Sequence, residues 1–205
     1  KGFIGAPQVV PNAIDYFWFS IATENQREKM ATFLPTMYNN LDMGRQGFIY
    51  GSVNSVESGG SKLVKRLSPS GEDILRREGF HPPVGDIKGN NNFIDIASRR
   101  NGVYSVLDQK TGRIFTYNKN SELLYIFGGL GDFIGEFEYP VAIELMNDNI
   151  LVLDSNNNNI TVFRPTAYAQ NIHSAISNYN NGNYKHAKGK WENVIFKNTN
   201  FELAY

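Results

Sequence analysis

A repeat of short apolar segments is the feature that most constrains the fold of this chain. Three successive units line up segment by segment, and the segments are rich in β-branched or aromatic residues and bounded by Gly, Asn, Pro or Ser, which is typical of β-strands. The first segments lie at 38–44, 93–98 and 141–146, the second at 47–54, 102–109 and 149–156, the third at 62–69, 113–120 and 159–166, and a fourth, in the first two units only, at 72–79 and 122–129. The repeat predicts three successive small sheets.

The spacing within the repeat indicates a β-propeller. Asp108 and Ile114 are six residues apart, as are Asp154 and Ile160, and the two pairs are offset by 46 residues. Propeller blades repeat every ~40–50 residues, and closed rings have ~4–8 blades. Residues 36–165 therefore predict a mainly β fold, an incomplete ring of about three four-stranded blades, with no fourth strand in the third. We expect further blades of a longer parent chain, or a second copy of this chain, to complete the ring.

A run of four asparagines lies between two apolar segments in "NDNILVLDSNNNNITVFRP" (147–165). Asn tolerates positive φ and hydrogen-bonds its own backbone, which suits a tight turn. The run occupies the place of "DQKTG" one unit earlier, so it predicts the loop between the second and third strands of a blade. Asp154, which closes the second strand, is expected to accept hydrogen bonds from turn amides.

The last unit, "GEFEYPVAIELMNDNILVLDSNNNNITVF", resembles the NHL-repeat family: a glycine-rich linker, Phe, Pro, an apolar strand, and a strand ending in Asp before a turn. The 93–127 unit is similar and keeps Arg113 before the Ile, where the last unit has Asn159; the 38–79 unit matches least. The resemblance implies a fold like that of the calcium-dependent lactonases of the gluconolactonase type and the zinc-dependent lyases that act on peptidylglycine. Both hold a metal on the propeller axis.

The N-terminal flank differs from the repeat. Residues 1–10 are interpreted as the outer strand of a preceding blade. Residues 11–35 predict a helical hairpin, because Asn12 with Asp15, and Thr23 with Gln26, have the spacing of reciprocal N-caps. The aromatic run "YFWF" (16–19) within it favours packing of the hairpin against a blade over a membrane-interface anchor or a partner site.

The C-terminal flank, residues 166–205, resembles a tetratricopeptide repeat. The small residues of such a repeat let two helices cross closely while aromatic residues fill the space beside them. The residues that carry the resemblance are Ala175, Gly182, Tyr184, Ala187, Trp191 and Val194. The resemblance implies a helical segment that offers a groove to peptides.

Composition excludes several classes of function. Twenty basic residues balance twenty acidic ones, and Glu72 and Asp73 interrupt the basic stretch 65–77, so nucleic-acid binding is not expected. The absence of cysteine excludes disulfides and thiol catalysis. No apolar run approaches the ~20 residues of a membrane-spanning helix. The chain begins at Lys1 and ends within a helical pattern, so we interpret it as part of a longer protein.

Candidate metal ligands are few. The three histidines, His81, His173 and His186, lie in an inter-blade loop or in the helical segment, so a three-histidine zinc site has no source in the blades. Carboxylates on or near the predicted first strands could bind calcium, which takes six to eight oxygen ligands, together with Asn40 and water. These metal candidates are Asp42, Asp95 and Glu144. The interpretation favoured over metal binding is that they are solvated or channel-lining acids that accept hydrogen bonds from backbone amides.

The sequence therefore predicts a non-catalytic binding scaffold, without a cofactor, for a protein or a glycan. The alternative is a divalent-metal-dependent, gluconolactonase-like hydrolase, and a third hypothesis makes the propeller a support for the helices. Tyr104, Tyr117 and Tyr139 could stack on sugar rings or pack between blades, and packing is favoured. The combination of modules resembles bacterial exported or surface-anchored proteins, which implies an extracytoplasmic or cell-surface location.

Overall fold

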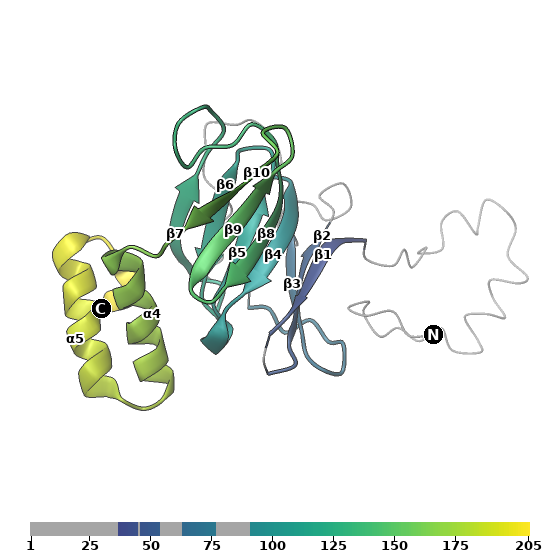
Figure 1. Ribbon diagram of the computed structural model, residues 1–205. Coiled ribbons are helices and arrows are strands. Elements are labelled where there is room, and N and C mark those ends of the chain that lie inside the picture. The colour runs from purple at the N-terminus through teal and green to yellow at the C-terminus, as the bar shows by residue number, and fades with distance from the viewer. Residues whose placement is uncertain (1–36, 45, 54–62, 77–90) are drawn as a thin grey trace, which may run out of the picture.

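A computed structural model describes residues 37–44, 46–53, 63–76 and 91–205. These residues form a mainly β fold of three antiparallel sheets followed by two helices (Figure 1). The predicted outer strand at 1–10, the helical hairpin at 11–35 and the loop that carries His81 lie outside the described residues.

Each sheet is a meander in which strands that follow one another in sequence pair side by side. The first sheet contains β1 (Tyr38–Met43), β2 (Ile49–Val53) and β3 (Val64–Leu67). The second contains β4 (Phe93–Ser98), β5 (Tyr104–Asp108), β6 (Arg113–Tyr117) and β7 (Leu123–Gly128). The third contains β8 (Pro140–Met146), β9 (Asn149–Asp154) and β10 (Asn159–Phe163).

Among the described residues, every strand predicted for the three units is present except the fourth strand of the first unit, of which residues 77–79 are not described. The second sheet alone has four strands; in the third, α4 follows β10 directly, as the sequence indicated. Within the expected fourth segment of the first unit, 72–79, the described part forms one isolated bridge, between Leu67 and Asp73. The four-stranded pattern is therefore complete only in the second sheet among the described residues.

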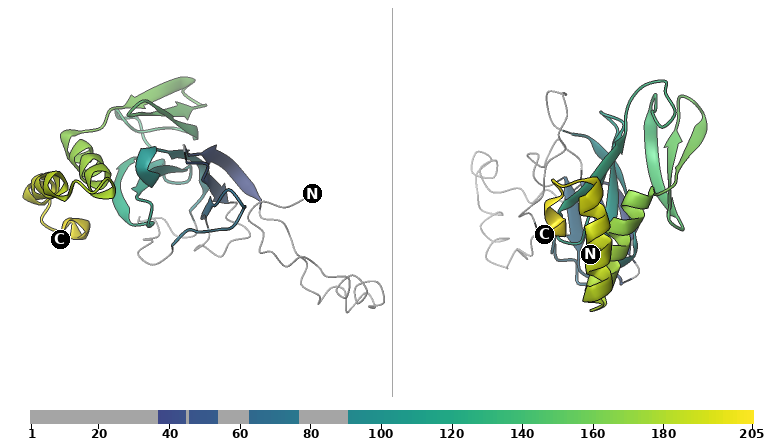
Figure 2. Two further views of the ribbon diagram at one scale, coloured as in Figure 1. Left: turned by 90° about the horizontal axis from the view of Figure 1, so that it is seen from below. Right: turned by 90° about the vertical axis from the view of Figure 1, so that its left-hand side faces the viewer.

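The three sheets stack through their first strands, since β1 contacts β4 and β4 contacts β8. Figure 2, viewed from below, shows the sheets fanning out around this line of contact. One apolar cluster, which includes Tyr50, Val106 and Phe115, fills the space between the first and second sheets. A second cluster, which includes Leu107 and Ile150, fills the space between the second and third. The arrangement is consistent with successive blades of a partial β-propeller.

The turn that contains the asparagine run is organised by Asp154. Its carboxylate accepts hydrogen bonds from the backbone amides of Glu138 (2.7 Å), Tyr139 (3.1 Å), Asn156 (3.1 Å) and Asn157 (3.3 Å). Burial alone would raise the pKa of this carboxyl, but the donated hydrogen bonds outweigh it and hold the pKa below its ordinary value. The prediction of a turn-capping aspartate between the second and third strands is confirmed.

The helices form an antiparallel pair. Thr166 caps α4 (Ala167–Asn180) by accepting a hydrogen bond from the Ala169 amide, and α5 (Tyr184–Lys197) follows a turn in which Gly182 has φ +78°. Ala175, Ala187 and Val194 are buried as the small-residue pattern predicted, whereas Tyr184 is 64% exposed and contacts Tyr179 at the end of the pair. A 3₁₀ turn, η2 (Glu202–Ala204), ends the chain.

The helices pack against the second sheet and not only against each other. One apolar cluster contains residues of both the sheet and the helices. Val103 precedes β5 and Leu124 belongs to β7, and both pack with Ile172 of α4 and Val194 of α5. The Lys119 ammonium also donates to the Asn180 side chain, at 2.7 Å. The helix pair and the second sheet therefore share an apolar cluster, separate from the two clusters that lie between the sheets.

Candidate functional site

Three turns gather at one end of the sheets, because β1, β4 and β8 lie side by side and each leads into a tight turn to the next strand. The turn of the second sheet is a short 3₁₀ element, η1 (Arg100–Gly102), with Asn101 at φ +64°. The turn of the third has Asn147 at φ +58°. Asn is the non-glycine residue that best tolerates this conformation.

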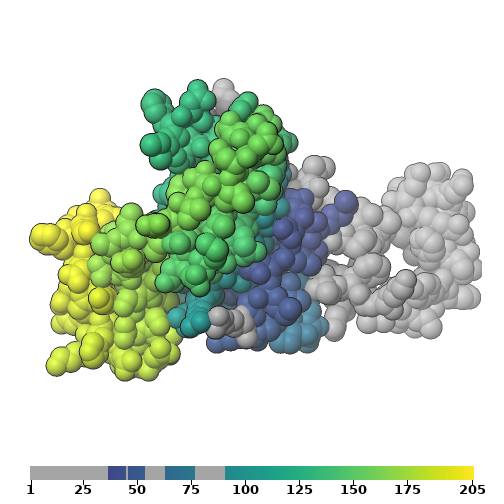
Figure 3. All heavy atoms as spheres, viewed as in Figure 1, coloured from purple at the N-terminus to yellow at the C-terminus, as the bar shows by residue number. Residues whose placement is uncertain are grey.

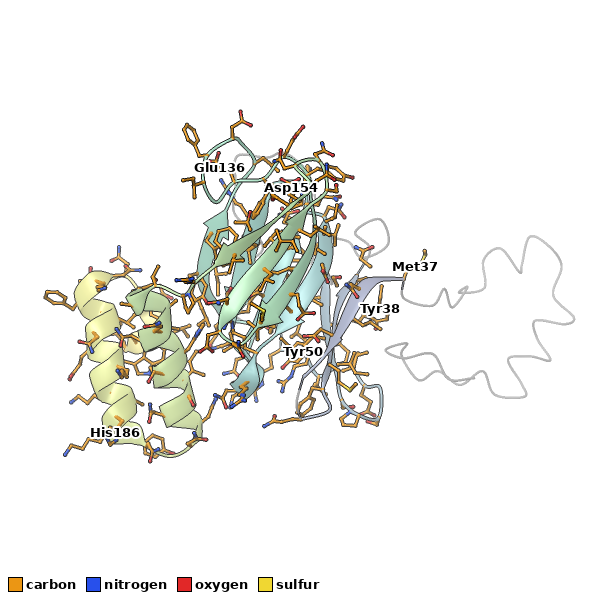
Figure 4. All side chains as sticks on the ribbon, viewed as in Figure 1. Met37, Tyr38, Tyr50, Glu136, Asp154 and His186 are labelled. Carbon is orange, nitrogen blue, oxygen red and sulfur yellow. The ribbon has the colours of Figure 1, made fainter. Side chains whose placement is uncertain are left out.

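These turns and helix α4 enclose a cavity of about 660 Å³. Most of its lining is polar, and it comes from all three sheets and from the helix. The lining residues include Asp42, Gly44, Ser98, Arg99, Asn101, Glu144, Asn147, Asp148, His173, Ser174 and Ser177. Tyr50 lies toward this end of the molecule and Asp154 toward the other (Figure 4). The pocket is thus separate from the asparagine turn.

Arg99 is the most constrained charge in this pocket. Its guanidinium donates from Nη1 to the backbone oxygen of Asp148 at 2.9 Å, which ties the turns of the second and third sheets together. Its Nε is buried and has no hydrogen-bond partner among the described residues. Burial lowers the pKa of this arginine, but an arginine keeps its charge at any physiological pH. The wall of the pocket therefore carries a fixed positive charge that is tied to the turn of the third sheet.

His173 of α4 forms one wall of the same pocket. Its Nε2 lies 2.8 Å from the Tyr125 hydroxyl on β7, and the two rings are 5.8 Å apart. Burial, and then the positive charge of Arg99, lower the pKa of His173 to about 4. His173 is therefore neutral at pH 7 and links the helix pair to the second sheet.

Sequence reasoning missed both Arg99 and His173 as site residues. Arg99 is 49 residues from its partner Asp148, and His173 is 48 residues from Tyr125. No local pattern marks such pairs. The one available signal was "RRNG" (99–102), two arginines entering a tight turn directly after a predicted strand.

The three carboxylates considered as metal ligands come from β1, β4 and β8, one from each sheet, and they bond in different ways. Asp42 accepts a hydrogen bond from the Ser98 amide (2.5 Å), and Glu144 accepts one from the Leu145 amide (2.7 Å); both line the pocket. Asp95 is buried beneath it.

The Asp95 carboxylate already has three donors. Asn40 donates its side-chain amide (2.6 Å), and the backbone amides of Ile96 (2.8 Å) and Ile143 (2.7 Å) donate as well. Burial raises the pKa of Asp95, and these hydrogen bonds act in the opposite direction. Asp95 thus joins the first strands of all three sheets, and its bonds to backbone amides are of the kind that the sequence favoured over metal binding.

Within the described parts of the chain, no group of three or more histidine, aspartate or glutamate side chains is arranged to hold a metal ion. Of the described histidines, His173 is engaged with Tyr125, and His186 is exposed on α5 at the lower end of the helix pair (Figure 4).

The tyrosines considered for sugar stacking divide into two kinds. Tyr104 and Tyr117 are fully buried and stack on each other with ring centroids 5.5 Å apart. They pack between the first two sheets, as favoured from the sequence. Tyr139, in contrast, is 47% exposed.

A second, apolar groove of about 370 Å³ lies where the chain leaves the third sheet for the helices. Tyr125, Phe127, Phe163, Pro165 and Tyr168 line it, with Arg164 at its rim. Arg99 borders this groove and the polar pocket alike, so the two hollows are neighbours.

Comparisons with known proteins give no family. No protein-family model matches the sequence, and no curated protein matches it. Among solved structures, BBS1N in complex with ARL6DN is 17% identical with a TM-score of 0.42, covering 65% of this chain and 39% of its own. A streptogramin B lyase is 17% identical with a TM-score of 0.39, and the match covers 68% of this chain and 44% of the lyase. Sqt1 of Saccharomyces cerevisiae is 11% identical with a TM-score of 0.40, and the match covers 70% of this chain and 38% of Sqt1.

The chain thus spans less than half the length of each of these three structures. At these identities and TM-scores the matches give no function to this chain. Among the helices of the described residues, none has the length and apolar character needed to cross a membrane.

Proposed function

We propose that this chain is a non-catalytic binding scaffold, built as an NHL-like propeller arc with a tetratricopeptide-like helix pair, whose ligand is a protein or a glycan. The observation that carries the proposal is the polar pocket. Turns from all three sheets and a helix converge on it, and its lining contains the guanidinium of Arg99 beside Asn, Ser and Asp side chains. A guanidinium carries several N–H donors, and the oxygens of a ligand in the pocket can accept hydrogen bonds from it.

The pocket lining favours recognition over catalysis. Asn, Ser and Asp side chains together with Arg form the set that hydrogen-bonds peptide groups or sugar hydroxyls. Among the described residues, the neutral His173 hydrogen-bonds to Tyr125 and to no serine hydroxyl or carboxylate. The tetratricopeptide-like assignment is supported by the buried Ala175 and Ala187 at the helix crossing and by the turn at Gly182.

A binding screen tests the proposal. The immobilised chain is exposed to a glycan array and to a displayed peptide library, and hits are measured again with Arg99→Ala and with Ser177→Trp, which fills the pocket from α4. Both variants should weaken binding at least tenfold. Arg164→Ala is the matched control, because it removes an equal charge from the neighbouring apolar groove. Hits that bind the pocket variants and the wild type equally would refute the assignment of this site.

Calorimetric titration of calcium tests the hydrolase hypothesis. Because Asn40, Ile96 and Ile143 already donate to Asp95, we expect no micromolar binding of calcium to the chelator-treated chain. Micromolar binding that disappears in Asp95→Ala would favour the metal-dependent hydrolase over the scaffold.

An extracytoplasmic location belongs to the same proposal. It rests on the resemblance to exported proteins with these two modules, and the lack of cysteine agrees with it. Protease accessibility on intact cells of the source organism tests it: digestion only after lysis would place the chain inside.

A further inference from the structure

The third sheet has an apolar face that nothing in the described chain covers. Strand pairing puts Leu153 opposite Ile160 and Leu151 opposite Val162, so these four side chains share one face. Ala142, opposite Leu153, extends that face onto β8. We call it the third-sheet face. Leu153 is 40% exposed, Ile160 58% and Val162 48%. In the space-filling view, β8–β10 lie in front with no other segment over them (Figure 3).

The same positions of the second sheet are completely buried. There, Leu107 pairs with Ile114 as Leu153 pairs with Ile160, at the 46-residue offset of the repeat. Leu107 and Ile114 are both 0% exposed, because they pack against Ile143, Ile150 and Val152 of the third sheet. The third-sheet face therefore repeats a surface that, one unit earlier, receives another sheet.

The first sheet has the reciprocal surface. Leu41 in the first sheet is equivalent to Ile96 in the second and Ile143 in the third. Their cross-strand partners are Gly51, Val106 and Val152, respectively. Ile96 and Ile143 are buried by the preceding sheet, whereas Leu41 is 44% exposed. Met43, on the same face as Leu41, is 71% exposed. We call this side, Leu41, Met43 and Ile49, the first-sheet face.

We propose that the third-sheet face of one molecule binds the first-sheet face of a second copy of this chain. One chain carries both surfaces. Leu153 and Ile160 stand at the positions of the buried Leu107 and Ile114. Leu41 stands at the position of the buried Ile96 and Ile143, with Gly51 where those two sheets have Val106 and Val152. The charges also suit the contact: Glu144 shares the third-sheet face, and Lys65 pairs with Gly51 on the first-sheet side. Opposite charges that meet across an interface favour one orientation of the partners.

This contact is head to tail, so it either closes into a ring or propagates as a filament. The three sheets turn progressively around one line of contact (Figure 2). Two copies bring six sheets together, which is within the ~4–8 blades of closed propellers. A closed dimer covers both faces of both copies, and the structure therefore points to a dimer rather than an open assembly.

Light scattering after size-exclusion chromatography tests the dimer. The wild type should run at twice its 23.1 kDa mass at micromolar concentration. Leu153→Asp and Ile160→Lys should each give a monomer with an unchanged circular dichroism spectrum. Phe133→Asp is the matched control: Phe133 is 81% exposed in the loop before β8, away from both faces, and its variant should remain dimeric. A wild type that is monomeric at all concentrations would overturn the proposal.

Cysteine pairing then tests the orientation, since the chain contains no cysteine of its own. Met43→Cys and Leu153→Cys proteins are mixed and oxidised. The head-to-tail contact predicts disulfide-linked dimers in the mixture and few with either protein alone. Strong cross-linking of Leu153→Cys to itself would mean that two third-sheet faces meet, and large polymers in the wild type would mean that the contact does not close; both results contradict the proposal.

Discussion

The second and third sheets pair their strands in the same register, and their strands recur at nearly the same sequence spacing. The second sheet is nevertheless covered on both faces, whereas the third sheet is covered on only one face by the described residues. Leu107 and Leu153 occupy equivalent positions in the two sheets. Each lies opposite the residue that follows a β-bulge in the neighbouring first strand, Asp95 for Leu107 and Ala142 for Leu153. Leu107 is completely buried and Leu153 is 40% exposed. The burial of a position in this repeat is thus set by whether a neighbouring sheet is present and not by the strand's own sequence.

The largest expected effect is the contrast between charges placed at these two positions. Leu107→Asp puts an unpaired carboxylate into a closed core and should cost more than about 4 kcal/mol of unfolding free energy. Leu153→Asp should cost less than about 1 kcal/mol in the isolated monomer, because the side chain is 40% exposed and a carboxylate there can reach water. Urea denaturation of both variants measures the difference. Equal destabilisation would mean that the third-sheet face is buried within the monomer.

Removal of residues 166–205 should have the next largest effect. The helices cover Val103 and Leu124 beside the second sheet, and exposure of these two side chains should cost about 3–5 kcal/mol. The denaturation midpoint of the truncated chain measures this loss, and Phe196→Ala, which trims an 88% exposed side chain of α5, is the control that should change nothing. The hypothesis that the propeller only supports the helices predicts that the truncated chain stays folded but loses all binding.

Asp108 and Asp154, the aspartates that cap the turns of the second and third sheets, allow a sharper comparison of the two sheets because they make similar hydrogen bonds. Asp108 accepts from the Asn92 amide and the Thr111 hydroxyl, as Asp154 accepts from the amides of Glu138 and Tyr139. Changing either aspartate to Ala leaves buried amides without an acceptor and should cost about 2–3 kcal/mol. A much smaller effect of Asp154→Ala, measured by thermal unfolding, would show that the third sheet is less ordered at its turn as well as open on its face.

The Asp154 contribution has a defined pH dependence. Its folded-state pKa is depressed, so the stabilisation is present above the ordinary carboxyl pKa of 3.8 and is lost as the pH falls through the lower folded value. The stability of Asp154→Ala should therefore fall less steeply on acidification than that of the wild type.

The smallest expected effect is at His173, which lies at the junction of the helices with the second sheet. Its pKa of about 4 is below the ordinary 6.5, so the unfolded chain binds the proton more readily between these values. Stability is complete above pH 6.5 and should decrease by about 1–2 kcal/mol by pH 5. A His173→Gln variant should lack this decrease in chemical denaturation curves at pH 7 and pH 5. An identical decrease in the variant would assign it to other groups.

Most strands of the fold were predictable from the sequence because they depend on local signals. The segment 93–98 is a strand over its whole predicted length, and the asparagine run forms the predicted hairpin turn at Asp154. The candidate site was less predictable. Asp42 and Glu144 line the pocket, but Arg99 and His173, its most constrained side chains, gave no local pattern.

The sequence by itself determined the repeat, the strand order, the turn chemistry and the small residues of the helix crossing. Each depends on residues a few positions apart, where backbone propensity and side-chain periodicity act directly. Tertiary structure alone decided that Asp95 joins three strands, that Arg99 reaches Asp148 and that Leu153 stays exposed while Leu107 is buried. Those outcomes depend on which sheet lies next to which, and sequence periodicity states only that a face is apolar, not what covers it.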